Sequence, residues 1–267
     1  MIVVTSAILQ VNCVIVRARR EPADAGGRQD AGRSAGPGET FVIDSPVLPD
    51  ELDALPALLE QAGFPDPSGL LVTHGDWDHL LGRIAFPGVA LGCAESTAER
   101  LLASPGRAQR DLRAFDEDLL IERDRPLALG AVQALPVPGR CAVGDRELEV
   151  YAAGGHTPDG MAVLIRWASV LIPGDYLSTV ELPTLADRGD LGAYLAALER
   201  LRPLVAAAAH VVPGHGPVMD GQQALGALEE DAAYLRALRE RRADAELPAR
   251  RRGAAQRRLH RENAAAL

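Results

Sequence analysis

The chain has 267 residues and a formal net charge of −9 at neutral pH. Its length and its 47% hydrophobic content suffice for one large core, and no linker separates two core-rich halves. We therefore expect one domain over residues 1–247 and an arginine-rich tail or helix over 248–267. The acidic balance argues against a surface that neutralises phosphates, so we expect no nucleic-acid partner.

The cysteines favour a reducing compartment, and the hydropathy pattern argues against a membrane-spanning segment. Cys13, Cys93 and Cys141 are widely spaced and form no CxxC pair, which favours neither a disulfide framework nor a thiolate metal site. No apolar run approaches the ~20 residues that span a bilayer, and the first residues lack a basic segment and a cleavage site. We expect a cytoplasmic protein with no membrane partner.

The first third of the chain predicts strands, one helix and one long loop. Short β-branched runs predict strands over 1–9, 13–19, 40–46 and 68–74. The leucine spacing in DELDALPALLEQAG predicts a helix over 50–63. Residues 18–39 are rich in glycine, alanine and charge, and we expect them to form a mobile loop.

The remainder predicts a second block of strands followed by helices. Short helices are expected over 77–86 and 95–103, and residues 104–129 are ambiguous. Further strands are expected over 88–94, 131–137, 146–154, 160–167, 169–175 and 210–216. Long helices are expected over 190–206 and 221–245. Because strands come in two blocks without βαβ alternation, we expect an α+β fold with two sheets face to face and helices outside.

Potential metal ligands recur in loops at the ends of predicted strands. Four of the six histidines lie there, together with several aspartates. The motifs are THGDWDH with His74, Asp76, Asp78 and His79, GGHTPDG with His156, IPGDY with Asp175, and PGHGP with His215. Imidazoles and carboxylates on such loops can meet at one rim of a sheet, where a site can bind metal and still admit substrate.

The ordered series of these four motifs resembles the metallo-β-lactamase-fold hydrolase superfamily. Members of that superfamily share an HxHxDH loop, a later histidine, a bridging aspartate and a last histidine. The resemblance implies an αββα sandwich with the site at one edge of the two sheets. It implies a first metal held by His74, Asp76 and His156, a second held by Asp78, His79 and His215, and Asp175 as the bridge.

The resemblance also implies a reaction. It predicts hydrolysis of an ester, thioester or lactone-like bond in a small molecule by a metal-bound hydroxide. Two divalent ions, zinc in the first instance, lower the pKa of a shared water from ~9 toward ~7 and polarise a carbonyl or phosphoryl oxygen. Asp78 would orient the hydroxide as a catalytic residue.

Asp76 departs from the superfamily pattern, since the loop reads HxDxDH. A carboxylate oxygen can take the place of an imidazole nitrogen, but a third carboxylate removes one unit of positive charge from the site. An oxygen ligand also favours iron or manganese over zinc. Two alternatives therefore stay open, an iron-dependent oxidoreductase of the same fold, resembling a persulfide dioxygenase, and a non-catalytic metal-binding scaffold.

Four residues near the predicted ligands are expected to support the site. Asp44, in VIDSP, and Thr157, after His156, are predicted to hold ligands by hydrogen bonds and not to bind metal. Tyr176 and Ser178 follow Asp175 and either contact a substrate or serve as packing and turn residues.

The remaining histidines and the last arginines have simpler interpretations. His210 is expected to be structural. His260 and the arginines of 250–252 and 257–258 are expected to lie on a solvated helix face.

Overall fold

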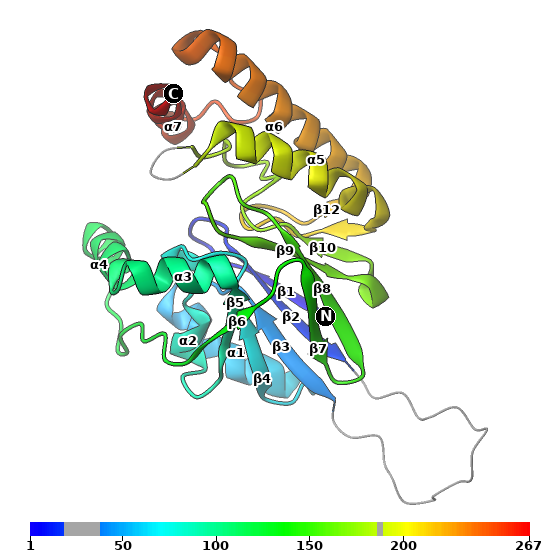
Figure 1. The fold of residues 1–267 in the computed structure, drawn as a ribbon. Helices are drawn as coiled ribbons and strands as arrows, with labels where there is room; N and C mark the ends of the chain where they lie inside the picture. Colours follow the sequence, from blue (N-terminus) through cyan, green and yellow to red (C-terminus); the bar gives the residue numbers. More distant parts are fainter. Residues whose placement is uncertain (19–37, 186–188) are drawn as a thin grey trace, which may run out of the picture.

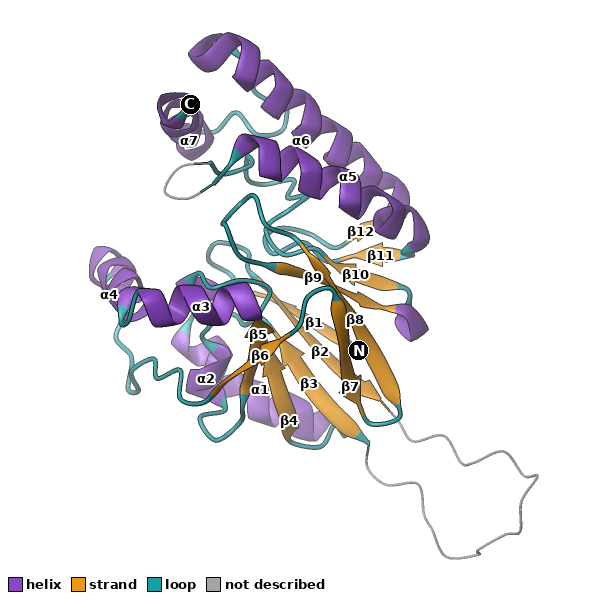
Figure 2. Cartoon of the chain, viewed as in Figure 1, coloured by secondary structure: helices purple, strands orange, loops and turns teal. Residues whose placement is uncertain are grey.

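The computed structural model describes residues 1–18, 38–185 and 189–267. In these residues two six-stranded sheets pack face to face, and helices cover the outer side of each sheet (Figures 1 and 2). This arrangement confirms the predicted αββα sandwich. The predicted mobile loop over 18–39 lies outside the described residues except at its two ends.

The first sheet is mixed and comes from the first half of the chain. Its strands, in spatial order, are β1 (Ile2–Thr5), β2 (Asn12–Ala18), β3 (Glu39–Ile43), β4 (Pro67–Leu71), β5 (Leu91–Ala94) and β6 (Val132–Leu135). β1, β2 and β3 pair antiparallel, whereas β3 to β6 run parallel. The carboxyl ends of β3, β4 and β5 therefore meet at one edge of the sheet.

The second sheet comes from the second half of the chain. Its strands, in spatial order, are β12 (Met219–Asp220), β11 (His210–Val211), β10 (Val170–Ile172), β9 (Met161–Ile165), β8 (Arg146–Ala152) and β7 (Gly139–Val143). β9 and β10 pair antiparallel and form a hairpin around Trp167 and Ala168. β10 and β11 run parallel, so the loops that follow them leave at the same edge.

Helices form the two outer layers (Figure 1). Those beside the first sheet are α1 (Pro49–Gln61), α2 (Gly82–Ala85), α3 (Glu95–Ala103) and α4 (Arg107–Leu119). Those beside the second sheet are α5 (Leu191–Ala207) and α6 (Gly221–Arg241), and α7 (Ala254–Ala266) packs against α6 on the side away from the strands. Short 3-10 turns cover Trp77–His79, Arg166–Ala168 and Arg242–Asp244. None of the helices in the described residues is both long enough and apolar enough to cross a membrane.

Side chains alternate between two hydrophobic clusters along the strands. On β2, Val14 and Val16 face the second sheet, whereas Cys13 and Ile15 face the cluster beneath α1. This period of two is what a strand buried on both faces requires. A third cluster joins the outer face of the second sheet to α5 and α6.

The structure corrects several local predictions. The ambiguous stretch over 104–129 contains α4, and β7 was not expected from the sequence. The solvated helix face predicted for His260 is wrong, because its ring packs near Tyr234 and is 6% exposed. Arg251 is 1% exposed, so the same prediction is wrong for this arginine. His210 begins β11 and is exposed, so its structural role stays a prediction.

Candidate metal centre

The predicted ligands meet at the edge where the loops of both sheets leave. His74 follows β4, and the 3-10 turn Trp77–His79 brings Asp78 and His79 to the same place. The second sheet contributes Asp175 after β10, His215 after β11, and His156 from the turn between β8 and β9. Each half of the chain therefore supplies part of the set.

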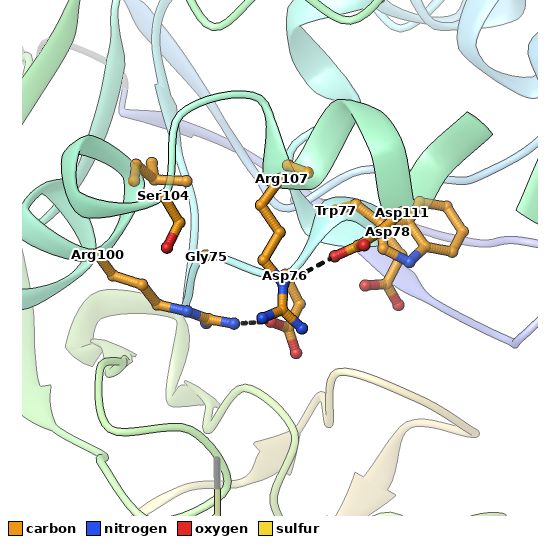
Figure 3. Close-up of a pocket in the computed structure, with 10 residues that line it drawn as sticks. Gly75, Asp76, Trp77, Asp78, Arg100, Ser104, Arg107 and Asp111 are labelled. Atoms are coloured by element: carbon orange, nitrogen blue, oxygen red, sulfur yellow. Dashed lines mark hydrogen bonds and ion pairs between the residues drawn. The ribbon is translucent and has the colours of Figure 1, made fainter. Parts of the chain in front are cut away.

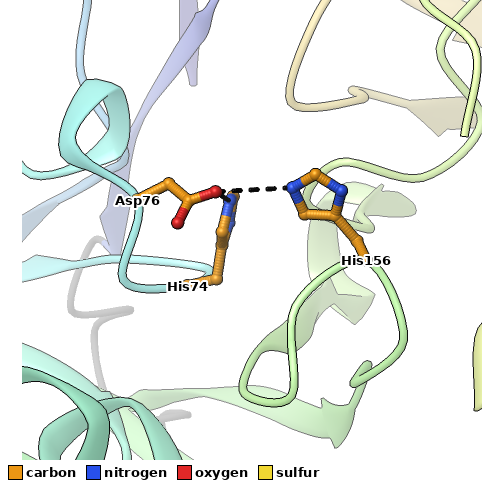
Figure 4. A group of neighbouring side chains, drawn as sticks. All are labelled: His74, Asp76 and His156. Atoms are coloured by element: carbon orange, nitrogen blue, oxygen red, sulfur yellow. Dashed lines mark ion pairs between the residues drawn. The ribbon is translucent and has the colours of Figure 1, made fainter. Parts of the chain in front are cut away.

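His74, Asp76 and His156 form a first group that could hold a metal ion (Figure 4). The Oδ2 atom of Asp76 lies 3.4 Å from His74 Nε2 and 3.5 Å from His156 Nε2. Asp76 thus takes the place that the superfamily pattern gives to a histidine.

Asp78, His79 and His215 form a second group. Asp78 Oδ2 lies 3.4 Å from His215 Nε2 and 3.8 Å from His79 Nε2. Asp175 lies between the two groups. Its Oδ2 is 3.5 Å from His74 Nε2 and 3.3 Å from both His156 Nε2 and His215 Nε2. Its Oδ1 is 3.2 Å from His79 Nε2.

These atoms fit a bound cation. Among the residues that the structure describes, His74 Nε2, His79 Nε2, His156 Nε2 and Asp175 Oδ1 are buried and have no hydrogen-bond partner. Unpaired buried polar atoms are costly, and they are rare unless a ligand satisfies them. Ligands about 2.0–2.1 Å from a tetrahedral ion lie about 3.3–3.4 Å apart, close to most of the separations above.

The Nδ1 atoms of His79 and His215 lie beside acceptors that can orient the two rings, whereas His156 Nδ1 has no hydrogen-bond partner. His79 Nδ1 lies 3.1 Å from Asp44 Oδ2, and Asp44 also accepts hydrogen bonds from the Thr73 amide and hydroxyl. His215 Nδ1 lies 2.8 Å from the carbonyl oxygen of Leu9. Such contacts fix the tautomer that presents Nε2 to a metal. Asp44 therefore lies where its predicted supporting role requires.

The carboxylates raise the proton affinity of the histidines in the metal-free protein. Burial lowers the pKa of His215, but the carboxylates of Asp175, Glu181 and Asp78 together outweigh burial and raise that pKa to about 10. The same opposition raises the pKa of His79 well above its usual range. Burial raises the pKa of Asp175, but His215, His79 and His74 together hold it well below its usual range. A metal must displace the histidine protons when it binds.

Comparison with known proteins assigns the family. The sequence profile of the metallo-β-lactamase superfamily matches residues 24–215, which is more than half of the chain. The chain belongs to the metallo-β-lactamase superfamily. The search among curated proteins found no match.

Solved structures of superfamily proteins share the fold. TTHA1429, a metallo-β-lactamase family protein from Thermus thermophilus, is 20% identical with a TM-score of 0.68 and covers 99% of this chain and 90% of its own. TTHA1623 in a di-iron-bound form is 21% identical with a TM-score of 0.57, covering 84% of this chain and 96% of its own. BLEG-1 B3 metallo-β-lactamase is 19% identical with a TM-score of 0.57, covering 84% and 95%.

The supporting residues predicted from the sequence lie around the ligands of this superfamily member. The Tyr176 hydroxyl donates to the Ala153 carbonyl oxygen and accepts from the His156 amide, at 2.9 and 3.1 Å. These two hydrogen bonds hold the His156 loop. Tyr176 itself is buried, with 2% of its surface exposed, and a substrate contact by Tyr176 stays a prediction. The Thr157 hydroxyl donates to the carbonyl oxygen of Asp159 at 3.0 Å.

Ser178 lies beside the second metal group. Its hydroxyl accepts hydrogen bonds from the amides of Val180 and Glu181. It lines a cavity of about 10 Å³ together with His156, Asp175, Glu181 and His215, among other residues. That space suits about one water molecule. A substrate contact by Ser178 also stays a prediction.

The Asn12 side chain and Gly214 shape the last ligand loop, and sequence reasoning missed both. The Asn12 amide group donates to the carbonyl oxygens of Pro213 and Gly216, at 2.8 and 2.7 Å, on either side of His215. A Cβ at Gly214 would lie 1.9 Å from Asp175 Oδ1, so the close approach of Asp175 requires glycine. Asn12 lies in the VNCVIV strand, and its contact with residues 213–216 cannot be inferred from the sequence because it depends on how the two sheets pack.

A second cavity, larger than the one beside Ser178, lies next to Asp76 and Asp78 (Figure 3). Its volume is about 220 Å³. The other lining residues include Gly75, Trp77, Arg100, Ser104, Arg107 and Asp111. Arg100 was not predicted from the sequence, since nothing in ESTAERLLA marks it. Asp159, which pairs with Arg100, could have been noticed because it shares GGHTPDG with His156.

Proposed function

We propose that this protein is a hydrolase that uses two divalent metal ions to cleave an ester, thioester or lactone-like bond in a small molecule. The observation that carries the proposal is the convergence of four imidazole Nε2 atoms and three carboxylates on two adjoining positions, with Asp175 between them. Two adjacent divalent ions supply a hydroxide at neutral pH and polarise the substrate carbonyl. The proposal therefore assigns the reaction to this edge of the sandwich.

The residues of the chain have separate tasks in this reaction. Asp175 holds the two positions at a fixed separation, because its two oxygens face ligands of both groups. Asp78 is 8% exposed, and its Oδ2 atom faces His215. From this position the carboxylate can accept a hydrogen bond from an attacking water. A carboxylate in that position orients the water and receives its proton.

The cavity beside Asp76 supports a small substrate. Its volume of about 220 Å³ is below the ~300–1,000 Å³ of pockets for drug-sized ligands. Its wall combines arginine side chains with Ser104 and aspartates, so it offers hydrogen bonds more than apolar contact. We infer a small polar substrate.

The acidic net charge of −9 supports the further proposal that the protein has no nucleic-acid partner. The absence of a membrane partner and a cytoplasmic location stay predictions from the sequence.

The test is a substrate panel with controlled metal content. The protein is stripped with a chelator, reconstituted with Zn²⁺, Fe²⁺ or Mn²⁺, and assayed with aryl esters, thioesters and lactones. We expect hydrolysis that chelation abolishes and one of these metals restores. His156→Ala, which removes a ligand, should lose activity by about 100-fold or more, whereas His210→Ala at the exposed start of β11 should keep it. Full metal occupancy without hydrolysis of any of the three bond types would contradict the proposal.

An iron-dependent oxidoreductase is the second candidate. The observation that favours it is the oxygen ligand that Asp76 adds, since carboxylates suit iron better than zinc, and the related TTHA1623 structure is a di-iron-bound form. Oxygen consumption with a persulfide substrate by the Fe²⁺-loaded protein, together with no hydrolysis, would favour this candidate. Metal content alone does not separate the two, because hydrolases can also use iron.

A further inference from the structure

Arg100 joins the unusual ligand Asp76 to a second buried carboxylate. It belongs to α3, and its guanidinium reaches the ligand loop from outside (Figure 3). Nη2 lies 2.5 Å from Asp76 Oδ1, and Nη1 lies 2.8 Å from Asp159 Oδ1. The side chain of Arg100 is 11% exposed, so both contacts are made largely out of water. Charge-assisted contacts of this kind are strong and directional.

This contact divides the two oxygens of Asp76 between different tasks. Oδ1 faces Arg100, and Oδ2 faces the Nε2 atoms of His74 and His156. A free carboxylate turns easily about its last bond, since that torsion has broad wells. The side chain of Asp76 is 31% exposed, so packing alone restrains it little. Arg100 therefore fixes which oxygen enters the metal position.

Arg100 also changes the charge of the site. Asp76, Asp78 and Asp175 bring three negative charges to the two metal groups, one more than the superfamily pattern supplies. A guanidinium always carries a positive charge, and this one touches the additional carboxylate. It therefore offsets the charge that Asp76 adds.

Asp159 holds Arg100 and the ligand loop together. Its Oδ2 accepts a hydrogen bond from the Gly75 amide at 2.9 Å, and its side chain is 1% exposed. A Cβ at Gly75 would approach Asp159 Oδ2 to 3.3 Å and Arg100 Nη1 to 3.5 Å, which leaves little room for a larger side chain. The arginine is thus held against Asp76 by the loop that also carries His156.

We propose that Arg100 is a positioning residue for Asp76, which directs one oxygen of Asp76 into the first metal position and balances the third carboxylate. The inference rests on the metal site of the proposed function. It makes Arg100 and Asp76 one unit. A histidine at position 76 presents a single inward nitrogen and adds no negative charge, so with Asp76→His the arginine is unnecessary and its charge opposes a bound cation.

The experiment compares four full-length proteins, the wild type, Arg100→Met, Asp76→His and the double variant. Metal content is measured by elemental analysis, and affinity for Zn²⁺ and Mn²⁺ by competition with a chromophoric chelator. In the wild-type background, we expect Arg100→Met to lower the affinity for the more weakly bound of the two metal ions by about tenfold or more. With Asp76→His, the same change should alter affinity by less than about threefold or should strengthen binding.

Three controls separate positioning from a general effect on the fold. Arg110→Met removes an exposed arginine on α4 and should leave metal affinity unchanged. Arg100→Lys keeps the charge but not the two-ended contact, and it should bind metal with intermediate affinity. Circular dichroism and thermal melting of the metal-free proteins check folding. If Arg100→Met does not fold, Arg100→Lys in both backgrounds gives the same comparison.

The outcomes distinguish this proposal from the proposed function. An equal loss of affinity in both backgrounds, no loss in either, or a wild type that binds no metal would overturn the role of Arg100. A wild type that binds two metals, depends on Arg100 only in the Asp76 background and hydrolyses nothing would contradict the proposed function alone. Loss of hydrolysis in Arg100→Met with unchanged metal affinity would also overturn the positioning role.

Discussion

Two buried polar clusters in this molecule differ in how their charges are matched. At the metal centre, imidazole nitrogens and an oxygen of Asp175 point at one another without hydrogen-bond partners. Around Arg251, in the segment before α7, the guanidinium donates to groups of the chain itself. Several inward atoms of the first cluster lack any partner within the chain, whereas both terminal nitrogens of Arg251 have partners there and its Nε has none. Burial of charge alone therefore does not identify a functional site.

The Arg251 cluster holds the loop that borders the metal centre. Arg251 Nη1 donates to the carbonyl oxygens of Ser178 and Glu181 and to Asp231 Oδ1, at 3.0, 2.8 and 2.5 Å. Asn263 in α7 accepts from the Leu185 amide and donates to the Pro183 carbonyl oxygen. The C-terminal segment thus fixes the loop over 178–185, which carries Ser178 and Glu181.

The largest expected effect is on stability and comes from Arg251→Met. It leaves Asp231 buried without its partner, which costs about 3–5 kcal/mol in comparable pairs. Burial already raises the pKa of Asp231 to about 6, above its unfolded value, so stability from this group is present at low pH and is lost as the pH rises through 6. The deficit of the variant should therefore be larger at pH 7 than at pH 4. Urea denaturation at both pH values measures it.

Two further variants sharpen that test. Arg250→Met changes an exposed neighbour and should leave the unfolding midpoint nearly unchanged. Replacing both partners, Arg251→Met with Asp231→Leu, should recover most of the lost stability because no charge stays buried. Equal destabilisation by Arg250→Met and Arg251→Met would remove the distinction between the two clusters.

The next effect concerns the metal centre and appears only when metal is added. A metal that binds the folded state alone stabilises it by about 2.7 kcal/mol at 100 times its dissociation constant. We expect this gain in the wild type and in His210→Ala, and a much smaller gain in His215→Ala. Thermal melting with and without Zn²⁺, Fe²⁺ or Mn²⁺ measures it. A full gain in His215→Ala would mean that His215 is not a ligand.

The smallest effect comes from the contact behind the ligands. Asp44→Asn removes the charge beside His79 Nδ1, and loss of such a partner weakens metal affinity by about 10–100-fold. Asparagine tolerates the positive φ of 56° at this position, so the backbone need not change. Chelator competition measures the affinity, and melting of the metal-free protein provides the control. Unchanged affinity would show that Asp44 supports only Thr73.

The sequence could predict the ligand motifs because their determinants are local. Most of the candidate ligands follow a short apolar run bounded by turn residues, which indicates a buried strand, and glycines flank most of them, so strand-end loops were identifiable. The αββα sandwich followed from the resemblance of those motifs and from the two blocks of strands. β7 was missed because its sequence, GRCAV, lacks a clear alternation.

Residues that act across the fold could not be predicted in this way. Arg100 reaches Asp76 from a helix, Asn12 reaches the His215 loop, and Arg251 reaches Asp231 from beyond α6. Such contacts depend on how sheets and helices pack, which periodicity does not encode. The arginine-rich end was misread for the same reason, because a run of charges cannot reveal that one of its members is buried.

The division of the ligands between the two sheets has a consequence for the assembly of the protein in time. During synthesis, His74 to His79 leave the ribosome well before His156, Asp175 and His215. A nascent chain can offer a metal only part of the set, and the complete set exists only after both sheets have folded against each other. A metal that needs all of these side chains would therefore bind only after both sheets have folded.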